Sequence, residues 1–347
     1  MAKRGTADAM VEQILAVADE SVSDPPHTLE ARLTRGPLAV FWKAGHSLNM
    51  SRANSRKLES TVISVGALTM GGAGKSPFVA HLAQRLAEAG RSPAILTRGY
   101  GRKSRLDVIV PRGGTAQVEQ TGDEAQTYVR TGTAHVGIGP DRYEVGRRME
   151  RELKPDVFLL DDGFQHFRLQ RDHDIVLIDA LDPLGGGVFP LGRLREPFAA
   201  LARATAIVIT RAENRHVGIE RLIRRHNPHA PMFRARIVTT GLPKTIDGPI
   251  AAFCGLGQPR TFWRTLDTLG IKAAPRLVFP DHHRYSAGDL HEIFRQTTAA
   301  GAQALVTTEK DMMNFPGSHF LSPFPLYCLR IGIEIENEAE LLRHILS

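Results

Sequence analysis

Residues 61–76 read TVISVGALTMGGAGKS, an apolar strand-forming run that leads into a glycine-rich turn ending in Gly-Lys-Ser. Glycines lack a Cβ, so the backbone N–H groups of such a turn can surround phosphate oxygens at the start of a helix. In that arrangement Lys75 reaches the β- and γ-phosphates, and the Ser76 hydroxyl binds magnesium. The segment therefore predicts a strand, a phosphate loop and a helix, and with them the binding of a nucleoside triphosphate.

The predicted nucleotide-binding residues form the loop and the first helical turn: Thr69, Met70, Gly71, Gly72, Ala73, Gly74, Lys75 and Ser76. The match to the G-x-x-x-x-G-K-[ST] pattern is incomplete, because Thr69 stands where the pattern has its first glycine. The competing interpretation is a tight strand-to-helix turn with an incidental lysine. We favour the phosphate loop, because Pro77 suits a first helical turn and an apolar stripe follows it.

Composition narrows the class of protein without choosing a partner. The chain has 347 residues, of which 42% are hydrophobic, enough for two domains with their own cores. Its only cysteines, Cys254 and Cys328, lie in apolar strand-like runs, which indicates a reducing compartment and no catalytic cysteine. The net charge of +7 favours an anionic partner, namely a nucleotide, a nucleic acid or an acidic membrane surface.

No stretch has the roughly 18 uninterrupted apolar residues of a spanning helix, and the start of the chain lacks a signal sequence. A cytoplasmic location is therefore expected. Residues 28–57 mix Leu38, Phe41 and Trp42 with several arginines and lysines. That mixture favours either a segment lying on an anionic membrane surface or a helix packed on the main domain with a solvated basic face.

Downstream of the loop, apolar runs typical of strands alternate with helical patterns, which predicts an α/β fold. We expect a doubly wound, mostly parallel sheet of the P-loop NTPase type, followed by a second, smaller α/β domain. The predicted organisation is an N-terminal helical, membrane-surface segment (1–58), the P-loop core (59–235), and a smaller C-terminal domain that closes the active site (236–347). The Pro/Gly-rich stretch 227–249 marks the transition.

Asp161 and Asp162 follow the predicted strand 157–160, at the edge where open α/β sheets bind their ligands. A phosphate-loop enzyme needs a carboxylate there for magnesium, so Ser76 and one of these two aspartates are the expected metal ligands. Gln165 and His166 come next and are predicted to lie beside the γ-phosphate. A structural role for this histidine is the alternative.

Other polar residues lie on predicted loops. Asp123 opens a helix, so it is either an N-cap or the base that takes a proton from a hydroxyl acceptor. The FPDHHRY run at 279–285 offers acid–base or phosphate contacts, because typical zinc spacing is absent. Two basic loops, with Arg98 and Tyr100 in one and Arg193 in the other, are either anion clamps or solvated surface.

The motifs TMGGAGKSP, LTRGYGRK, GDEAQ, LLDDGFQHFRLQRDHDIVLIDA, PLGRLREP, FCGLGQPRTF, FPDHHRYS and TTEKD occur here in one order. In this order the chain resembles the tetraacyldisaccharide 4'-kinases of lipid A synthesis, from about residue 60 to about residue 315. The resemblance implies ATP- and Mg²⁺-dependent phosphorylation of the 4'-hydroxyl of a tetraacyldisaccharide 1-phosphate. It also implies a peripheral monomer on the cytoplasmic face of the bacterial inner membrane, with its active site between two domains.

The same resemblance assigns roles to individual residues. Asp123 and His282 match the dyad that deprotonates the sugar hydroxyl, and Lys75 joins them as the third catalytic residue. Gln165 and His166 match positions near metal and phosphates. The lipid A precursor and an anionic membrane surface are then the expected partners, and no nucleic acid is expected.

Three other functions compete with the kinase. A nucleotide-dependent switch ATPase has a lysine at the start of its deviant loop, where this chain has Met70. A dinucleotide oxidoreductase fits less well, because Gly-Lys-Ser with paired aspartates suits triphosphate and magnesium. A nucleic-acid-binding module is compatible with the charge, but no binding fold is recognisable.

Overall fold

The computed structural model describes residues 55–347 except 72, 103, 105, 188, 190, 191, 244, 258, 282 and 316–321. The predicted segment 1–58 therefore lies almost wholly outside the described residues. The strands of the described part are β1 (Thr61–Ala67), β2 (Pro93–Thr97), β3 (Val108–Val110), β4 (His135–Ile138), β5 (Val157–Asp161), β6 (His173–Asp179), β7 (Ala206–Thr210), β8 (Met232–Thr240), β9 (Ile250–Cys254), β10 (Ala273–Val278), β11 (Ala304–Thr308) and β12 (Leu326–Ile335).

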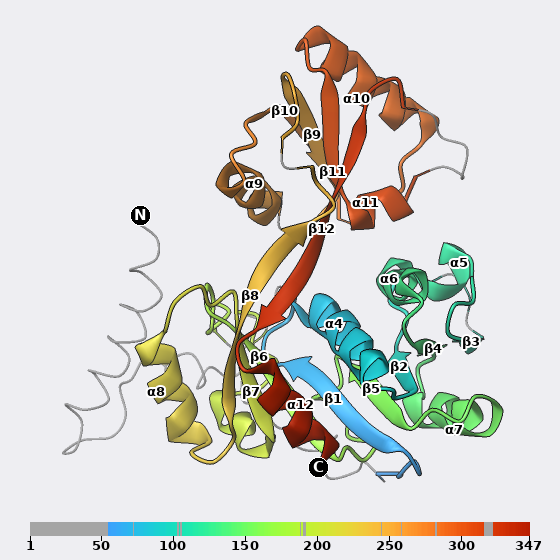
Figure 1. Ribbon diagram of the computed structural model, residues 1–347, viewed down its shortest axis with the longest axis vertical. Coiled ribbons are helices and arrows are strands. Elements are labelled where there is room, and N and C mark those ends of the chain that lie inside the picture. The colour runs from blue at the N-terminus through green and yellow to red at the C-terminus, as the bar shows by residue number, and fades with distance from the viewer. Residues whose placement is uncertain are drawn as a thin grey trace.

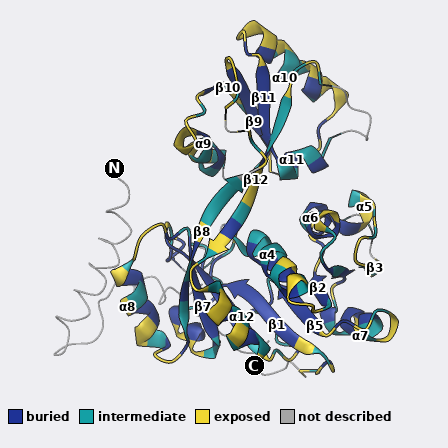
Figure 2. Ribbon diagram, viewed as in Figure 1, coloured by how far each residue is buried: buried dark blue, intermediate teal, exposed yellow. Residues whose placement is uncertain are grey.

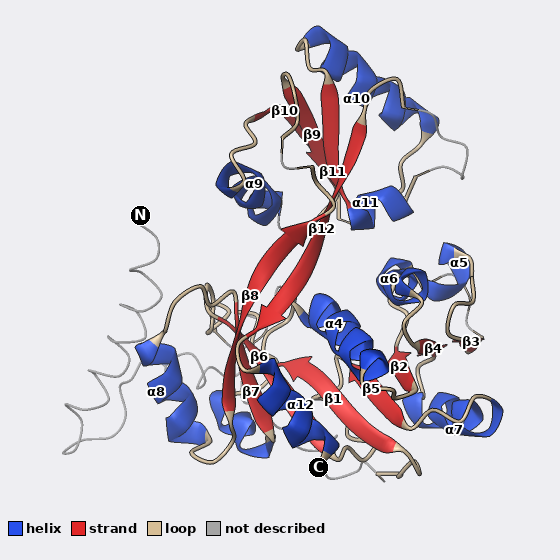
Figure 3. Cartoon of the chain, in the orientation of Figure 1, coloured by secondary structure: helices blue, strands red, loops and turns tan. Residues whose placement is uncertain are grey.

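Helices lie between and after these strands (Figures 1 and 3). They are α4 (Lys75–Glu88), α5 (Val118–Thr121), α6 (Asp123–Thr131), α7 (Arg142–Glu152), the 3₁₀ helix η1 (Phe198–Arg203), α8 (Val217–His226), α9 (Pro259–Thr268), α10 (Ala287–Ala299), α11 (Glu309–Met313) and α12 (Glu338–Leu346). The described strands form one sheet in the order β10-β9-β11-β12-β8-β7-β6-β1-β5-β2-β4-β3. The α/β class with a mostly parallel sheet is confirmed.

The core sheet is parallel from β8 to β4, and only β3 is antiparallel at its edge. Alternate residues of each strand point to opposite faces, so each buried strand feeds two apolar layers. Ile175 and Leu177 pack with α4, α6 and α12, whereas Val176 and Ile178 pack with α8 and η1. Helix α7 covers the neighbouring part of that second face. The sheet is thus covered on both sides, and its strands are buried (Figure 2).

A smaller unit extends from the core and repeats this plan. Strands β10, β9, β11 and the first half of β12 are parallel to one another. Helix α9 packs on one face through Phe262 and Leu266, and α10 packs on the other through Leu290 and Ile293. Cys254 is buried in β9, and burial raises the pKa of its thiol to about 12.

Two long antiparallel strands connect the units (Figure 1). Strand β8 starts beside β7 and then pairs with the second half of β12, from Ala235–Ile335 to Thr240–Arg330. The Pro/Gly content of residues 227–249 predicts only a transition between domains here. Its middle nevertheless alternates apolar and basic side chains, as a strand with one covered face does.

The last helix returns to the core. Leu341 and Ile345 of α12 are fully buried in the same apolar cluster as α4. Glu338 pairs with His81 and, at 2.8 Å, with Arg85, both on α4. The sequence predicts that all of 236–347 belongs to the smaller domain. Helix α12 instead packs on the core, because its apolar side chains contact the same apolar cluster as those of α4.

Gly66 of β1 is a position where only glycine fits. A Cβ there would lie 2.5 Å from the Cβ of the buried Phe164 and 2.8 Å from its backbone nitrogen. We expect Gly66→Ala to lower the free energy of unfolding by about 2 kcal/mol or more, as overpacking of a core does. Urea unfolding measures this. Gly288→Ala in helix α10 is the control, because a Cβ at this position would contact only Ser286 Oγ, at 3.6 Å. The free energy of unfolding of this variant should equal or exceed that of the wild type. Equal stability of both variants would contradict the packing described.

Candidate active site

The phosphate loop leaves β1 after Ala67 and enters α4 at Lys75, as the sequence predicts. Gly71 and Gly74 adopt left-handed φ values of 65° and 77°, which side chains with a Cβ rarely adopt. Gly74 is the N-cap of α4 and offers no side-chain cap. The first N–H groups of α4 are therefore not capped from Gly74, an arrangement that suits an anion. Gly72 lies outside the described residues.

The segment 193–195 runs alongside this loop and holds its shape. Thr69 and Leu194 form an antiparallel bridge, and Met70 N donates to Arg193 O at 2.7 Å. The Arg193 guanidinium donates to Met70 O at 3.2 Å and pairs with Asp182. The sequence predicts Arg193 as a substrate or phosphate contact. In the structure its guanidinium binds Met70 O and Asp182 and so stabilises the phosphate loop.

Lys75 and Arg195 meet at one carboxylate. Lys75 Nζ lies 3.3 Å from Asp162 Oδ1, and Arg195 Nη1 lies 2.7 Å from Asp162 Oδ2. Asp162 follows β5 directly and has a φ of 50°, an uncommon value for a residue with a side chain. The backbone turn at the end of β5 therefore points this carboxylate at the phosphate-loop lysine.

The two neighbouring aspartates have opposite electrostatic environments. Asp161 is buried and accepts a hydrogen bond from Thr97 Oγ1 at 3.1 Å. Burial and the adjacent Asp162 raise the pKa of Asp161 to about 6. Burial would also raise the pKa of Asp162, but Lys75 and Arg195 outweigh it and hold that pKa below its usual value. Asp161 is therefore the carboxylate whose negative charge is poorly compensated.

The hydroxyl of the buried Tyr128 lies beside Asp161. Tyr128 of α6 is fully buried, and burial followed by the nearby Asp161 raises the pKa of its hydroxyl. That hydroxyl faces the side chains of Ser76 and Asp161. Ser76 and Asp161, predicted as metal ligands from separate motifs, are thus brought close to one another.

Asp123 lies against the glycine-rich loop that contains Arg98 and Tyr100. A Cβ on Gly122 would lie 2.4 Å from Tyr100 O, and one on Gly101 would lie 4.0 Å from Asp123 Oδ1. Asp123 is buried at the first position of α6 and accepts a hydrogen bond from Glu124 N at 3.0 Å. Arg98 and Tyr100 are exposed.

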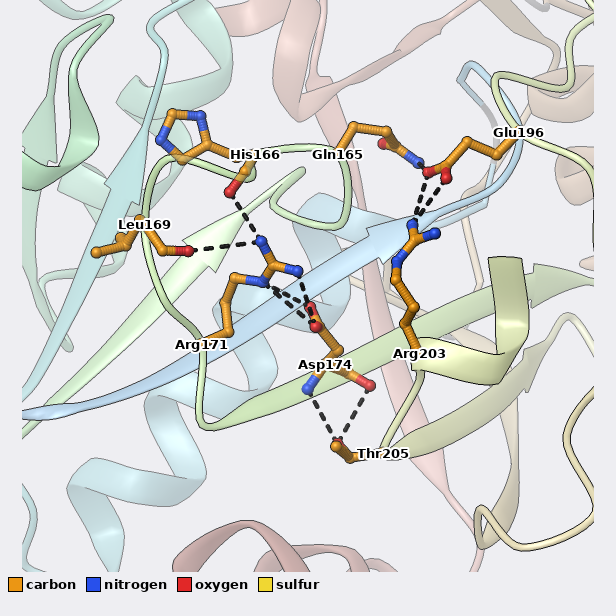
Figure 4. Close-up of polar contacts among 8 residues, drawn as sticks. All are labelled: Gln165, His166, Leu169, Arg171, Asp174, Glu196, Arg203 and Thr205. Atoms are coloured by element: carbon orange, nitrogen blue, oxygen red, sulfur yellow. Dashed lines mark hydrogen bonds and ion pairs between the residues drawn. The ribbon is translucent and has the colours of Figure 1, made fainter. Parts of the chain in front are cut away.

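Gln165 contacts one acidic and one basic side chain of the segment that follows Leu194. Figure 4 shows the acidic contact, in which Gln165 lies beside Glu196 and Glu196 pairs with Arg203. Gln165 Nε2 donates to Glu196 Oε1 at 2.9 Å, and Gln165 Oε1 accepts from Arg195 Nη1 at 3.2 Å. Glu196 is buried and pairs with Arg203 at 2.8 Å. The Arg203 guanidinium in turn covers the Phe164 ring at 4.4 Å. These contacts hold Gln165 in place, and Gln165 in turn positions Arg195, which pairs with Asp162.

His166 lies on the other side of the same loop from Gln165 (Figure 4). Arg171 Nη1 donates to the His166 carbonyl at 2.9 Å, while Arg171 pairs with Asp174 at 3.1 Å. The imidazole Nδ1 lies 3.3 Å from Arg142 Nη1. Burial and Arg142 lower the pKa of His166 to about 4, so the ring is neutral at pH 7.

The smaller unit faces the core through α11 and the 279–285 loop. His282 lies outside the described residues, so its predicted pairing with Asp123 stays a prediction. Beside it, Asp281 pairs with Lys310 at 3.1 Å, and the buried Tyr285 hydroxyl donates to Asp311 at 2.9 Å. Arg284 reaches Glu119 of the core at 3.1 Å.

Thr127 of α6 donates to Met313 Sδ of α11 at 3.8 Å. This contact and the Arg284–Glu119 pair join the smaller unit to the Asp123 side of the core.

Sequence reasoning missed four residues of the site: Thr97, Tyr128, Arg142 and Arg195. Arg195 and its neighbour Glu196 stand in the basic loop from which only Arg193 was selected. The pairing of 193–195 with the phosphate loop joins Met70 to Arg193, which are more than 120 positions apart in the chain. No local sequence pattern reveals such a contact.

The contrast between the two aspartates predicts opposite effects on stability. The pKa of Asp161 is higher in the folded state than its usual 3.8, so its contribution to stability is full below pH 3.8 and lost as pH rises through about 6. At pH 8, Asp161→Asn should therefore raise the free energy of unfolding, by about 3 kcal/mol, and at pH 5 by roughly half of that.

Asp162→Asn is the matched variant and should do the reverse. A lowered pKa gives stability that is present above pH 3.8 and lost only as pH falls further, so this variant should be destabilised at both pH 8 and pH 5. Urea unfolding of the protein without nucleotide or metal at these two values measures both effects. The same sign for both variants at pH 8 would overturn the electrostatic assignment.

Known proteins match this chain over most of its length. The family model described as Tetraacyldisaccharide-1-P 4'-kinase matches residues 33–347. A tetraacyldisaccharide 4'-kinase of Syntrophobacter fumaroxidans is 37% identical over 328 residues, which cover 89% of this chain and 85% of the relative. One of Koribacter versatilis is 36% identical over 326 residues, covering 90% and 97%.

A solved structure supports the same relationship. The crystal structure of LpxK from Aquifex aeolicus in complex with ATP matches with a TM-score of 0.70 and 29% identity, covering 92% of this chain and 99% of that one. The phosphate loop, the paired aspartates and the smaller α/β unit thus occur in a chain that matches this family model over residues 33–347. The chain belongs to the tetraacyldisaccharide-1-P 4'-kinase family.

Proposed function

We propose that this protein transfers the γ-phosphoryl group of ATP to the 4'-hydroxyl of a tetraacyldisaccharide 1-phosphate in lipid A synthesis. Membership of the kinase family supports the reaction. The observation that carries it is the meeting of Lys75 with Asp162 at the end of β5, beside a phosphate loop whose helix has Gly74 as its N-cap and so no capping side chain at that residue. A switch ATPase is not favoured, because the family is one of kinases.

The residues at the end of β5 fit a magnesium ion. Asp161 is a buried carboxylate with poorly compensated charge, and the Ser76 and Tyr128 hydroxyls lie close by. The described residues contain no group of three or more His, Cys, Asp and Glu side chains able to hold a metal. One buried carboxylate beside a hydroxyl suits Mg²⁺, which keeps several waters and binds through one or two carboxylates and the substrate phosphates.

We assign Ser76 and Asp161 as the protein ligands of the magnesium ion. Asp162 instead pairs with Lys75 and Arg195. The metal would neutralise charge on the transferring phosphoryl group.

The protein's own groups supply the remaining chemistry. The acceptor oxygen forms a bond to the γ-phosphorus, the bond to the β–γ bridging oxygen breaks, and ADP leaves with that electron pair. The proton of the hydroxyl passes to a base, for which Asp123 with His282 is the proposed dyad. Lys75 and Arg195 stabilise the negative charge on the phosphates. The contact of α6 with α11 supports an approach of the two loops that carry the dyad.

Transfer of labelled γ-phosphate from ATP to detergent-solubilised tetraacyldisaccharide 1-phosphate tests this function. Lys75→Ala should lower kcat about a hundredfold or more, because the lysine acts on charge that develops during transfer. Asp123→Asn should lower kcat by a similar factor and change the KM for ATP little, because the base acts only in the chemical step. Both losses follow from roles in catalysis.

Surface variants control for nonspecific damage. Lys57→Ala removes an exposed lysine that lies 3.8 Å from Asp172, and Asp156→Asn removes a half-exposed carboxylate at the opposite end of β5. Both should keep wild-type rates. ATP hydrolysis by wild type without labelled lipid would reject the kinase and favour the switch ATPase.

We further propose that the protein works as a peripheral monomer on the cytoplasmic face of the inner membrane. Among the described helices, none combines the length and the apolar character needed to cross a bilayer. The basic and apolar residues of 28–57 support contact with an anionic surface. The protein should sediment with anionic vesicles but not with zwitterionic ones, and 1 M salt should release it. Equal sedimentation with both kinds of vesicle would exclude charge as the cause.

A further inference from the structure

The hydroxyl of Thr97 holds one oxygen of the Asp161 carboxylate. Thr97 Oγ1 donates to Asp161 Oδ2 at 3.1 Å, and both residues are buried. Thr97 is the last residue of β2, a strand that is buried along its whole length. The backbone oxygen of Thr97 accepts from Gly139 N, just after β4, at 3.1 Å. The hydroxyl is therefore presented to the carboxylate by a rigid strand end.

The register of two neighbouring strands explains why these side chains meet. Strands β2 and β5 are parallel and pair as far as Leu96 with Leu160, so the next residues, Thr97 and Asp161, lie level with each other. Side chains alternate between the two faces of a sheet, so Asp161 shares the face on which Leu159 packs with α4 and α6. The Asp161 carboxylate thus lies on the side of the sheet where α4 begins with the phosphate loop.

The direction of this carboxylate matters for a magnesium ion. The Tyr128 hydroxyl of α6 faces both Asp161 and Ser76, so the two proposed protein ligands lie near one another. Mg²⁺ requires a nearly octahedral arrangement of oxygen atoms, and a carboxylate that rotates freely presents its oxygens in many directions. A hydrogen bond to Oδ2 from a buried strand end restricts that rotation.

The neighbouring carboxylate is held in a different way. Asp162 lies 3.3 Å from Lys75 Nζ and 2.7 Å from Arg195 Nη1, so two cations compensate its charge. A carboxylate with its charge compensated in this way attracts a metal ion less. Thr97 donates a neutral hydroxyl, which orients Asp161 and leaves its negative charge in place.

We propose that Thr97 is a positioning residue for magnesium, which fixes the Asp161 carboxylate through Oδ2 and leaves Oδ1 to the ion. The inference rests on the proposed kinase function and adds to it the side chain that orients the metal-binding carboxylate. Loss of a hydrogen bond to a metal ligand typically weakens the metal by tenfold to a hundredfold. The role of Thr97 concerns the metal, so binding of a metal-free nucleotide should not depend on its hydroxyl.

Nucleotide binding with and without magnesium tests this in the absence of phosphoryl transfer. The Kd of a non-hydrolysable ATP analogue is measured by calorimetry on the full chain, once with EDTA and once with excess Mg²⁺. By linkage, the ratio of the two values reports how strongly the protein itself holds the ion. Thr97→Val removes the hydroxyl and nearly keeps the shape of the side chain. It should shift this ratio about tenfold toward weaker binding with Mg²⁺ and leave the Kd in EDTA within about twofold of wild type.

Two further variants at the same position sharpen the test. Thr97→Ser keeps the hydroxyl and should restore most of the wild-type ratio, whereas Thr97→Ala should shift the ratio at least as far as Thr97→Val. Asp161→Asn, which alters the proposed ligand itself, should shift it further still. An unchanged ratio in Thr97→Val and Thr97→Ala would overturn the proposal. So would an equal loss of affinity in EDTA and in Mg²⁺, because the hydroxyl would then support the fold and not the metal.

Thr307→Val is the matched control. It removes another buried strand hydroxyl, which donates to Phe253 O at 2.9 Å in the smaller unit, and it should keep the wild-type ratio. Absence of phosphoryl transfer by wild type would reject the kinase function alone, because the two Kd values are measured without an acceptor.

Discussion

The contact of Lys75 with Asp162 is the interaction on which the site depends. It ties the first residue of α4 to the residue after β5, so the phosphate loop and the proposed magnesium site meet at one edge of the sheet. Arg195 completes the contact, and Gln165, Glu196 and Arg203 support it from behind. One carboxylate is thereby neutralised, and its neighbour Asp161 keeps an uncompensated charge.

This division of charge is costly for the folded protein and useful for its function. A buried carboxylate with a raised pKa destabilises the fold at neutral pH, and a bound cation removes that cost. The Tyr128 hydroxyl, buried beside Ser76 and Asp161, belongs to the same part of the site.

Local sequence was enough to predict the elements with strong patterns. The phosphate loop, the buried parallel strands and the Asp161–Asp162 end of β5 follow from glycines, apolar runs and strand ends. The antiparallel strand β8 and the returning helix α12 were missed, since their partners lie about 90 residues or more away along the chain. The same holds for Arg195 and Arg142, whose roles arise from contacts between segments that no local window contains.

The pairing of β8 with β12 has a topological consequence. The chain leaves the core along β8 and comes back along β12, and α12 then packs with α4. The smaller unit is therefore an insertion within a core whose last helix is supplied by the end of the chain. Shortening the protein from its C-terminus would damage the nucleotide-binding core before it touched the smaller unit. The smaller unit, in contrast, is a candidate for exchange between relatives, because the two points where the chain enters and leaves it lie side by side in the paired strands β8 and β12.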